Sequence, residues 1–149
     1  MTPNHALKAA LESIFRSFAY LDLHVSEADR EVPLTFSVGA EVTLGVPAGG
    51  VVALFLTGWA GVLAADNFIG AASTDQDRED VVRELANVIA GSVRSFIAGT
   101  QAQPLGIPRL LPKEQVERLW QQSTPEQRLV LADEEAVLAA VVLNVQQQS

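Results

Sequence analysis

The sequence contains no cysteine, and its 149 residues include only two histidines. The absence of cysteine excludes disulfides, zinc sites with thiolate ligands and catalysis by a thiol. It also fits a reducing compartment, so we expect a cytoplasmic protein. The two histidines, His5 and His24, lack the spacing of a pair of metal ligands. We therefore expect no metal site and no cofactor of the protein's own.

Basic residues and long apolar runs are also scarce. Lys and Arg number 10 against 18 Asp and Glu, which gives a net charge of -8 and a pI near 4.6. Such a chain has no basic stripe to neutralise phosphates, which argues against a nucleic-acid partner. No segment reaches the roughly 20 apolar residues that a membrane helix needs. The amino-terminal segment also lacks the apolar run of a secretory signal, so we expect no membrane partner.

Motifs of common enzyme classes are missing as well. The sequence has neither a phosphate-binding P-loop nor a G-x-S-x-G nucleophile elbow. Its glycines at 45, 49 and 50 indicate a turn, because no helix start follows them as a phosphate cradle would require. The acidic run at 133–135 is typical of a solvated hairpin tip, although carboxylates can also bind a cation.

Turn residues divide the chain into segments of helical and strand periodicity. Helices are expected from Asn4, a suitable N-cap, to Phe18, over 59–69, over a long segment that Gly99 ends, and after Pro112. Strands are expected over 36–46, 51–57, 127–132 and 136–145. The prolines around 105–111 leave room there for a short or edge strand. The polar stretch 73–77 is expected to be a surface loop that leads into the long helix.

This order of elements predicts an α+β fold. We expect a mainly antiparallel sheet on which two long helices and one or two short ones pack. The strands over 36–46 and 51–57 are close enough in sequence to pair as an antiparallel hairpin. A length of 149 residues with 48% hydrophobic residues suits a single domain spanning residues 1–149.

The long helix has two contrasting faces. At about 100° per residue, one broad apolar face is expected to contain Val82, Leu85, Ala86, Ile89, Val93, Phe96 and Ile97. A polar row on nearly the opposite side contains Asp80, Glu84, Asn87 and Gly91, at i, i+3 and i+4 steps. Periodicity alone leaves two interpretations open. The row could be an ordinary solvated surface, or an acid and an amide could be held rigidly towards another molecule.

The pattern Asp80-x-x-x-Glu84-x-x-Asn87, with the flanking segment 84–91 reading ELANVIAG, resembles the signature helix of a known family. That family is the CheC/CheX/FliY group of chemotaxis phosphatases, and the likeness extends over about residues 5–145. The single helix of this kind is similar to the CheX type, because CheC commonly carries two. The resemblance implies a CheC/CheX-like fold.

One feature departs from the family pattern. A distal proline is expected at position 110, where this chain has Leu110 between Pro108 and Pro112. A small difference in the loop would reconcile the two patterns. Pro108 is the preferred equivalent, and the mismatch concerns the loop more than the helix.

The resemblance also implies a reaction and its residues. Family members remove the phosphoryl group from the aspartyl phosphate of a CheY-like receiver, which itself holds the Mg²⁺. Asn87 is then expected to orient the attacking water, since an amide can both donate to and accept from one water. Glu84 is expected to pair with the receiver's lysine. Asp80 is expected to help docking or cap nearby backbone, and Gly91 to let the partner approach closely.

Two other readings of the chain stay open from the sequence. It could be a non-catalytic adaptor that docks a receiver, a chemosensory protein or a flagellar-switch protein. It could also be a dimeric structural domain whose polar row is simply its exposed face. The resemblance further implies a homodimer, with joined sheet edges as one possible arrangement.

Overall fold

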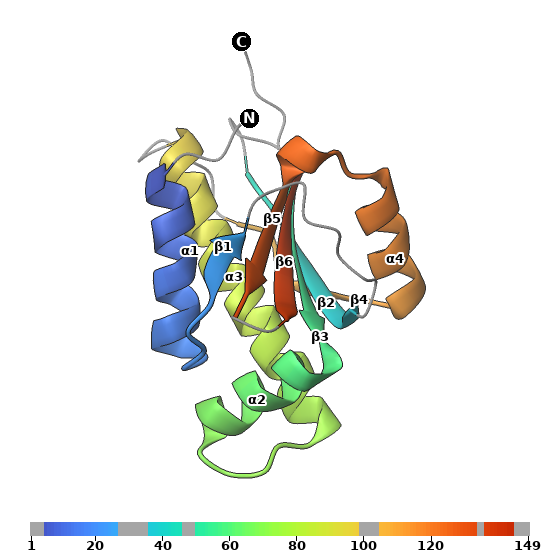
Figure 1. Ribbon diagram of the computed structural model, residues 1–149. Coiled ribbons are helices and arrows are strands. Elements are labelled where there is room, and N and C mark those ends of the chain that lie inside the picture. Colours follow the sequence, from blue (N-terminus) through green and yellow to red (C-terminus); the bar gives the residue numbers. More distant parts are fainter. Residues whose placement is uncertain (1–4, 27–35, 46–49, 99–104, 134–135, 145–149) are drawn as a thin grey trace.

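A six-stranded sheet forms the centre of the protein in the computed structural model, which describes residues 5–26, 36–45, 50–98, 105–133 and 136–144 (Figure 1). The strand order is β1-β5-β6-β3-β2-β4, and each neighbouring pair is antiparallel. The strands are β1 (His24–Ser26), β2 (Phe36–Thr43), β3 (Val51–Thr57), β4 (Arg109–Leu111), β5 (Arg128–Ala132) and β6 (Val137–Asn144).

Four α-helices cover this sheet in the described part of the chain: α1 (His5–Phe18), α2 (Gly58–Ile69), α3 (Asp75–Ala98) and α4 (Lys113–Gln122). A 3-10 turn, η2 (Pro125–Gln127), leads into β5. Helices α1 and α3 pack on one face of the sheet, α4 packs on the other, and α2 closes one end (Figure 1). The predicted α+β class, with its antiparallel sheet, is thereby confirmed.

Strand β3 shows how the sheet divides the core into two layers. Side chains alternate between the faces of a strand. Val52, Leu54 and Leu56 therefore join the core beneath α1 and α3, whereas Ala53 and Phe55 join the one beneath α4. All five are buried, as expected for a strand whose two faces are both covered by helices. The predicted hairpin of β2 and β3 is confirmed by their antiparallel register.

The connection from β3 to α3 is defined by its capping residues. Thr57 accepts a hydrogen bond at its Oγ1 from the backbone N–H of Ala60 and so caps α2. Gly70 ends α2 as predicted, with a φ of 79° that favours glycine. Thr74 then caps α3: its N–H donates to Asp77 Oδ2 over 2.9 Å, and the Asp77 N–H donates to Thr74 Oγ1 over 3.2 Å. Because of this reciprocal cap, α3 begins at Asp75, and the expected loop over 73–77 is shorter than predicted.

Strand β4 is a short strand at one edge of the sheet, as predicted for the segment around 105–111. It comprises three residues, Arg109–Leu111. Pro108 has no backbone N–H to donate to a sheet ladder, which limits how far the pairing extends. The strand pairs with β2, where Arg109 also forms an ion pair with Glu41. The opposite edge is β1, a strand that the periodicity did not predict.

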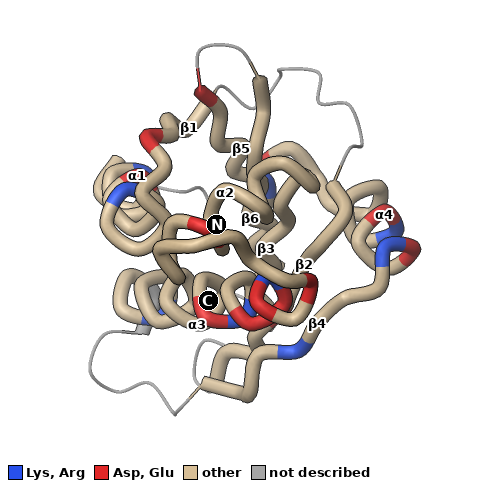
Figure 2. Tube along the Cα trace, turned by 90° about the horizontal axis from the view of Figure 1, so that it is seen from below, with Lys and Arg blue, Asp and Glu red and all other residues tan. Residues whose placement is uncertain are grey.

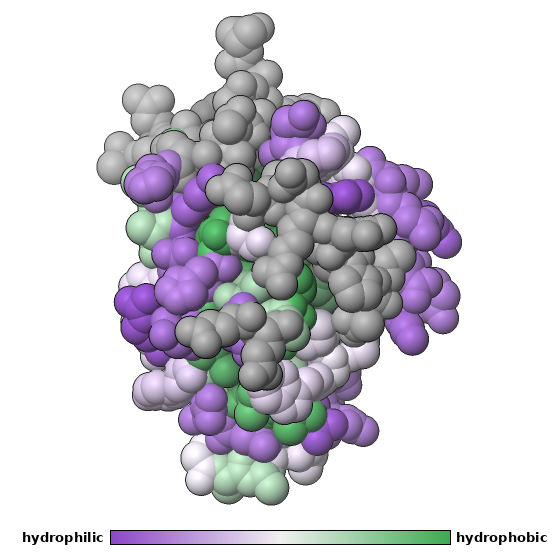
Figure 3. Space-filling model, viewed as in Figure 1, coloured by the Kyte–Doolittle hydropathy of each residue, from purple (hydrophilic) through white to green (hydrophobic). Residues whose placement is uncertain are grey.

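The two middle strands of the sheet, β6 and β3, carry no charged residue. Figure 2 shows acidic and basic residues along α3 and α4. In Figure 3 the outer surfaces of α1 and α4 are hydrophilic, and hydrophobic residues are visible between them. Within the described ranges, no helix combines the length and apolar character that crossing a membrane requires.

Candidate functional site

Helix α3 is held in place by its apolar face. Val82, Leu85, Ala86, Ile89 and Val93 are buried as predicted. They lie in the core that α3 shares with α1, α2 and the sheet. The prediction for Phe96 was wrong, because this side chain near the end of the helix is 40% exposed. The side chain of Ile97 lies outside the described residues. A helix buried along most of one face presents the opposite row at a fixed position.

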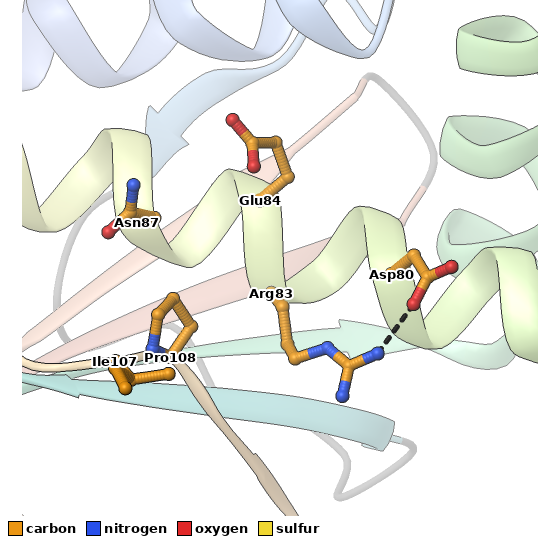
Figure 4. A pocket seen from close by; sticks show the side chains of 6 residues that line it. All are labelled: Asp80, Arg83, Glu84, Asn87, Ile107 and Pro108. Atoms are coloured by element: carbon orange, nitrogen blue, oxygen red, sulfur yellow. Dashed lines mark hydrogen bonds and ion pairs between the residues drawn. The ribbon is translucent and has the colours of Figure 1, made fainter.

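That opposite row faces outward. Asp80 and Glu84 are exposed, and Asn87 and Gly91 are half-buried. Glu84 and Asn87 are one helical turn apart and project from neighbouring positions on α3 (Figure 4). The structure thus places the acid and the amide at the surface, where both side chains can be reached by another molecule.

An open pocket with a volume of about 430 Å³ lies beside this row (Figure 4). Its lining comes from two segments that are distant in sequence: Asp80, Arg83, Glu84 and Asn87 from α3, and Ile107 and Pro108 from the stretch before β4. The pocket therefore combines both acids, a base and an amide with two apolar side chains. Gly91 does not contribute to its lining.

The second segment is fastened to the end of β2. The Gly106 N–H donates a hydrogen bond to the Thr43 carbonyl oxygen over 2.9 Å. This contact carries Ile107, which is 91% exposed, and Pro108 to the side of the pocket opposite α3. Pro112 instead occupies the N-cap position of α4. Of the two prolines weighed from the sequence, Pro108 is the one that lies at the pocket with Glu84 and Asn87.

Asp80 has partners on its own helix. Its Oδ1 accepts a hydrogen bond from Gln76 Nε2 over 2.9 Å and forms an ion pair with the Arg83 guanidinium. These two interactions, that with Gln76 first, lower the pKa of Asp80 from its ordinary value of 3.8. Asp80 is thus a charged side chain whose direction is set by Gln76 and Arg83.

Arg83 was not predicted as part of the site. It lies three residues after Asp80 and four before Asn87, and side chains at these spacings are neighbours on a helix surface. The same periodicity that selected the polar row could have identified it. Ile107 could not have been found in this way, because nothing local in the sequence connects it with α3.

Gly91 leaves free space on the outer side of α3. A Cβ atom placed on it would have Leu105 Cδ1 as its nearest neighbour, at 3.9 Å, which is an ordinary van der Waals contact. The fold itself therefore does not require glycine at this position. Across the ranges that the structure describes, no three His, Cys, Asp or Glu side chains are grouped as metal ligands would be.

Comparisons with solved structures show where this architecture recurs. CheX from Vibrio vulnificus superposes with a TM-score of 0.71 at 13% sequence identity, covering 95% of this chain and 97% of that one. CheX from Borrelia burgdorferi, solved as a CheX-CheY-BeF3-Mg²⁺ complex, gives 0.67 at 13% identity and covers 95% and 96%. FliY from Thermotoga maritima superposes with a TM-score of 0.52 at 14% identity, covering 96% of this chain and 92% of that one. No protein-family model and no curated protein matches the sequence.

These likenesses define the class of fold first: an antiparallel sheet with a long signature helix packed on one face. Within that class, the chain has the fold of the CheX, CheC-like and FliY chemotaxis proteins over almost its whole length. The resemblance carried by the sequence of α3 is confirmed at the level of the fold.

Proposed function

We propose that this chain is a CheX-like member of the CheC/CheX/FliY family and hydrolyses the aspartyl phosphate of a CheY-like receiver in the cytoplasm. The observation that carries the proposal is the outward placement of Glu84 and Asn87 beside an open pocket on a rigidly packed helix. The Borrelia burgdorferi CheX, which shares the fold, was solved together with CheY, BeF3 and Mg²⁺. That relative supports a receiver as the partner.

The chemistry needs little from the phosphatase. Water oxygen attacks phosphorus, the bond between phosphorus and the aspartyl oxygen breaks, and the aspartate leaves as a carboxylate. The released proton passes to the phosphate product or solvent. The receiver's Mg²⁺ neutralises charge on the phosphoryl oxygens, so a positioned water is the main contribution left for the partner. The Asn87 amide can supply this by accepting a hydrogen bond from the water and donating one to it.

Glu84 is assigned to docking geometry. It is exposed on α3, one turn before Asn87, and points to the side of the helix opposite Arg83 (Figure 4). A charge-assisted hydrogen bond from the receiver's lysine to this carboxylate would fix the angle at which the helix meets the phosphorylated site. Asn87 would then enter that site, and Gly91, further along α3, would leave room for the receiver's backbone.

The decisive experiment measures dephosphorylation of a receiver charged with acetyl phosphate. The wild-type chain should accelerate the decay, and Asn87→Ala should reduce this acceleration by about 10²-fold while leaving binding largely intact. Asn144→Ala, at an exposed position at the end of β6, is the matched control and should behave like wild type. If wild type and Asn87→Ala leave the decay equally unchanged for every cognate receiver, the enzyme assignment is wrong. If calorimetry shows that the chain binds the receiver without accelerating its dephosphorylation, the chain is an adaptor.

We also propose a homodimer, as the resemblance implies. The two edges of the sheet, β1 and β4, each have only three residues, and each carries backbone groups that a second copy could pair with. Sedimentation equilibrium over a range of concentrations distinguishes a dimer from a monomer. A monomer at all concentrations would remove this part of the proposal.

A further inference from the structure

Arg83 is the one basic residue among the six that line the pocket. It points to the side of α3 opposite Glu84, towards the segment that holds Ile107 and Pro108 (Figure 4). Asn87 lies four residues after Arg83 and three after Glu84, so it is a helical neighbour of both. The amide is therefore flanked by an anion on one side and a cation on the other.

Stability of the fold does not explain this arrangement. The Arg83 and Asp80 side chains are 35% and 56% exposed, and exposed ion pairs contribute only about 0–1 kcal/mol. A second Asp–Arg pair at the same i, i+3 spacing, Asp75–Arg78, differs in its surroundings. Arg78 also donates to the Ser73 carbonyl oxygen and so fastens the start of α3 to the preceding loop. Arg83 and its partner Asp80 instead both line the pocket.

Among the described residues, this ion pair occupies only part of the guanidinium. It engages one terminal nitrogen, Nη2, with Asp80 Oδ1. A guanidinium carries five N–H donors in a fixed fork that matches carboxylate and phosphate oxygens. Asp80, itself held by Gln76, keeps this fork at the mouth of the pocket. The remaining N–H groups can donate to an anionic oxygen of a docked molecule without breaking the pair.

We propose that Arg83 is a recognition residue that binds an anionic oxygen of the phosphorylated receiver, on the side of Asn87 opposite the lysine contact of Glu84. This inference rests on the proposed function. A phosphorylated receiver offers two kinds of anionic oxygen: those of the phosphoryl group and those of neighbouring carboxylates. Opposite charges on the two sides of Asn87 allow one docking orientation, because a reversed receiver would place like charges together. Asp80 acts as the positioning residue for Arg83.

The test compares binding of two forms of the cognate receiver, one with Mg²⁺ alone and one with Mg²⁺ and beryllofluoride as the phosphoryl analogue. Arg83→Gln should weaken binding of the loaded form about tenfold, as the loss of a charge-assisted hydrogen bond predicts. Arg83→Lys should restore part of the loss, since it keeps the charge but not the fork. Arg118→Gln, on α4 across the sheet, makes the same change in net charge and should bind like wild type.

The two receiver forms identify the contacted oxygen. A loss confined to the loaded form assigns the contact to the phosphoryl group, and an equal loss with both forms assigns it to a carboxylate. Either result supports the inference. Wild-type affinity of Arg83→Gln for both forms, measured beside a wild type that binds and dephosphorylates the receiver, overturns it while the proposed function stands. A wild type that neither binds nor accelerates decay overturns both.

Discussion

The Gly106 N–H donates to the Thr43 carbonyl oxygen over 2.9 Å, and this contact holds one wall of the pocket against β2. A Cβ on Gly106 would lie 2.0 Å from Thr43 Oγ1 and 3.3 Å from Thr43 Cβ. Gly106→Ala must therefore displace the hydroxyl or the segment, and we expect it to cost about 1–3 kcal/mol in the free energy of unfolding.

Urea denaturation of a double-mutant cycle checks this expectation. Thr43→Ala removes Oγ1, the atom closest to the added Cβ. The double variant Gly106→Ala/Thr43→Ala should therefore recover most of the free energy of unfolding that Gly106→Ala loses. The same pair of variants tests the pocket wall: receiver binding should fall in Gly106→Ala and recover in the double variant. An unchanged free energy of unfolding in Gly106→Ala would show that the Thr43 hydroxyl simply rotates away.

Gly91 offers a case in which stability and binding should change in opposite directions. Alanine fits at this position in the isolated chain, because the nearest atom would be 3.9 Å from its Cβ. Gly91→Ala should stabilise α3 by up to about 1 kcal/mol through helix propensity alone. If the receiver approaches the helix here, the added methyl group should weaken its binding.

Thermal or urea unfolding together with calorimetric titration of the receiver separates the two effects. Gly61→Ala in α2 is the control for binding, because it makes the same substitution in a helix that lies outside the proposed docking row on α3. A Gly91→Ala variant that binds the receiver as tightly as wild type would remove Gly91 from the docking surface.

Tyr20 is the one non-glycine residue with a positive φ in the described part of the chain, at 55°. It follows α1 by two residues, at a place where helices commonly end with glycine in the left-handed region. For a bulky side chain this conformation costs roughly 1–2 kcal/mol. The ring is 68% exposed, so little packing is lost with it. Tyr20→Gly should therefore raise the free energy of unfolding by up to about 1 kcal/mol, whereas Tyr20→Ala should not. Equal effects of the two substitutions in urea denaturation would contradict the strain.

Elements with a strong period were predictable from the sequence, and elements made by tertiary contact were not. The period of 3.6 in α3 and the apolar run of β3 identified both, and glycine at position 70 marked the end of α2. Strand β1 has three residues, too few to show a period. It is defined by pairing with β5 and by the Val25 N–H, which donates to Glu12 Oε2 over 2.8 Å.

The candidate site divides in the same way. Glu84 and Asn87 were found because both lie on one helix, where spacing determines direction. Ile107 and Pro108 reach the pocket only through the pairing of β4 with β2 and the bond from Gly106 to Thr43. The family pattern anticipated a proline nearby, but the residues alone could not choose between positions 108 and 112. The distance between segments is a property of the fold and not of local sequence.

Asp80 should titrate below its ordinary pKa of 3.8, since the Gln76 hydrogen bond and then the Arg83 interactions favour its charged form. Because the pKa is lower in the folded than in the unfolded chain, ionised Asp80 stabilises the fold above pH 3.8. This stabilisation is lost as the pH falls through the folded-state pKa. A carboxyl-carbon NMR titration measures it. Gln76→Ala should raise the pKa of Asp80, and so should Arg83→Gln. A wild-type pKa at or above the ordinary value would contradict the described contacts.

Glu84 should contribute charge to docking rather than stability to the fold. Its side chain is exposed on α3, so Glu84→Gln should change the free energy of unfolding by less than about 0.5 kcal/mol. Loss of a contact with the receiver's lysine should weaken binding about tenfold. Added salt should reduce the difference in receiver affinity between Glu84→Gln and wild type, because ions screen an exposed charge pair. Glu114→Gln, in the first turn of α4, is the matched control. A Glu84→Gln variant that binds like wild type at low salt would show that the lysine contact is made elsewhere.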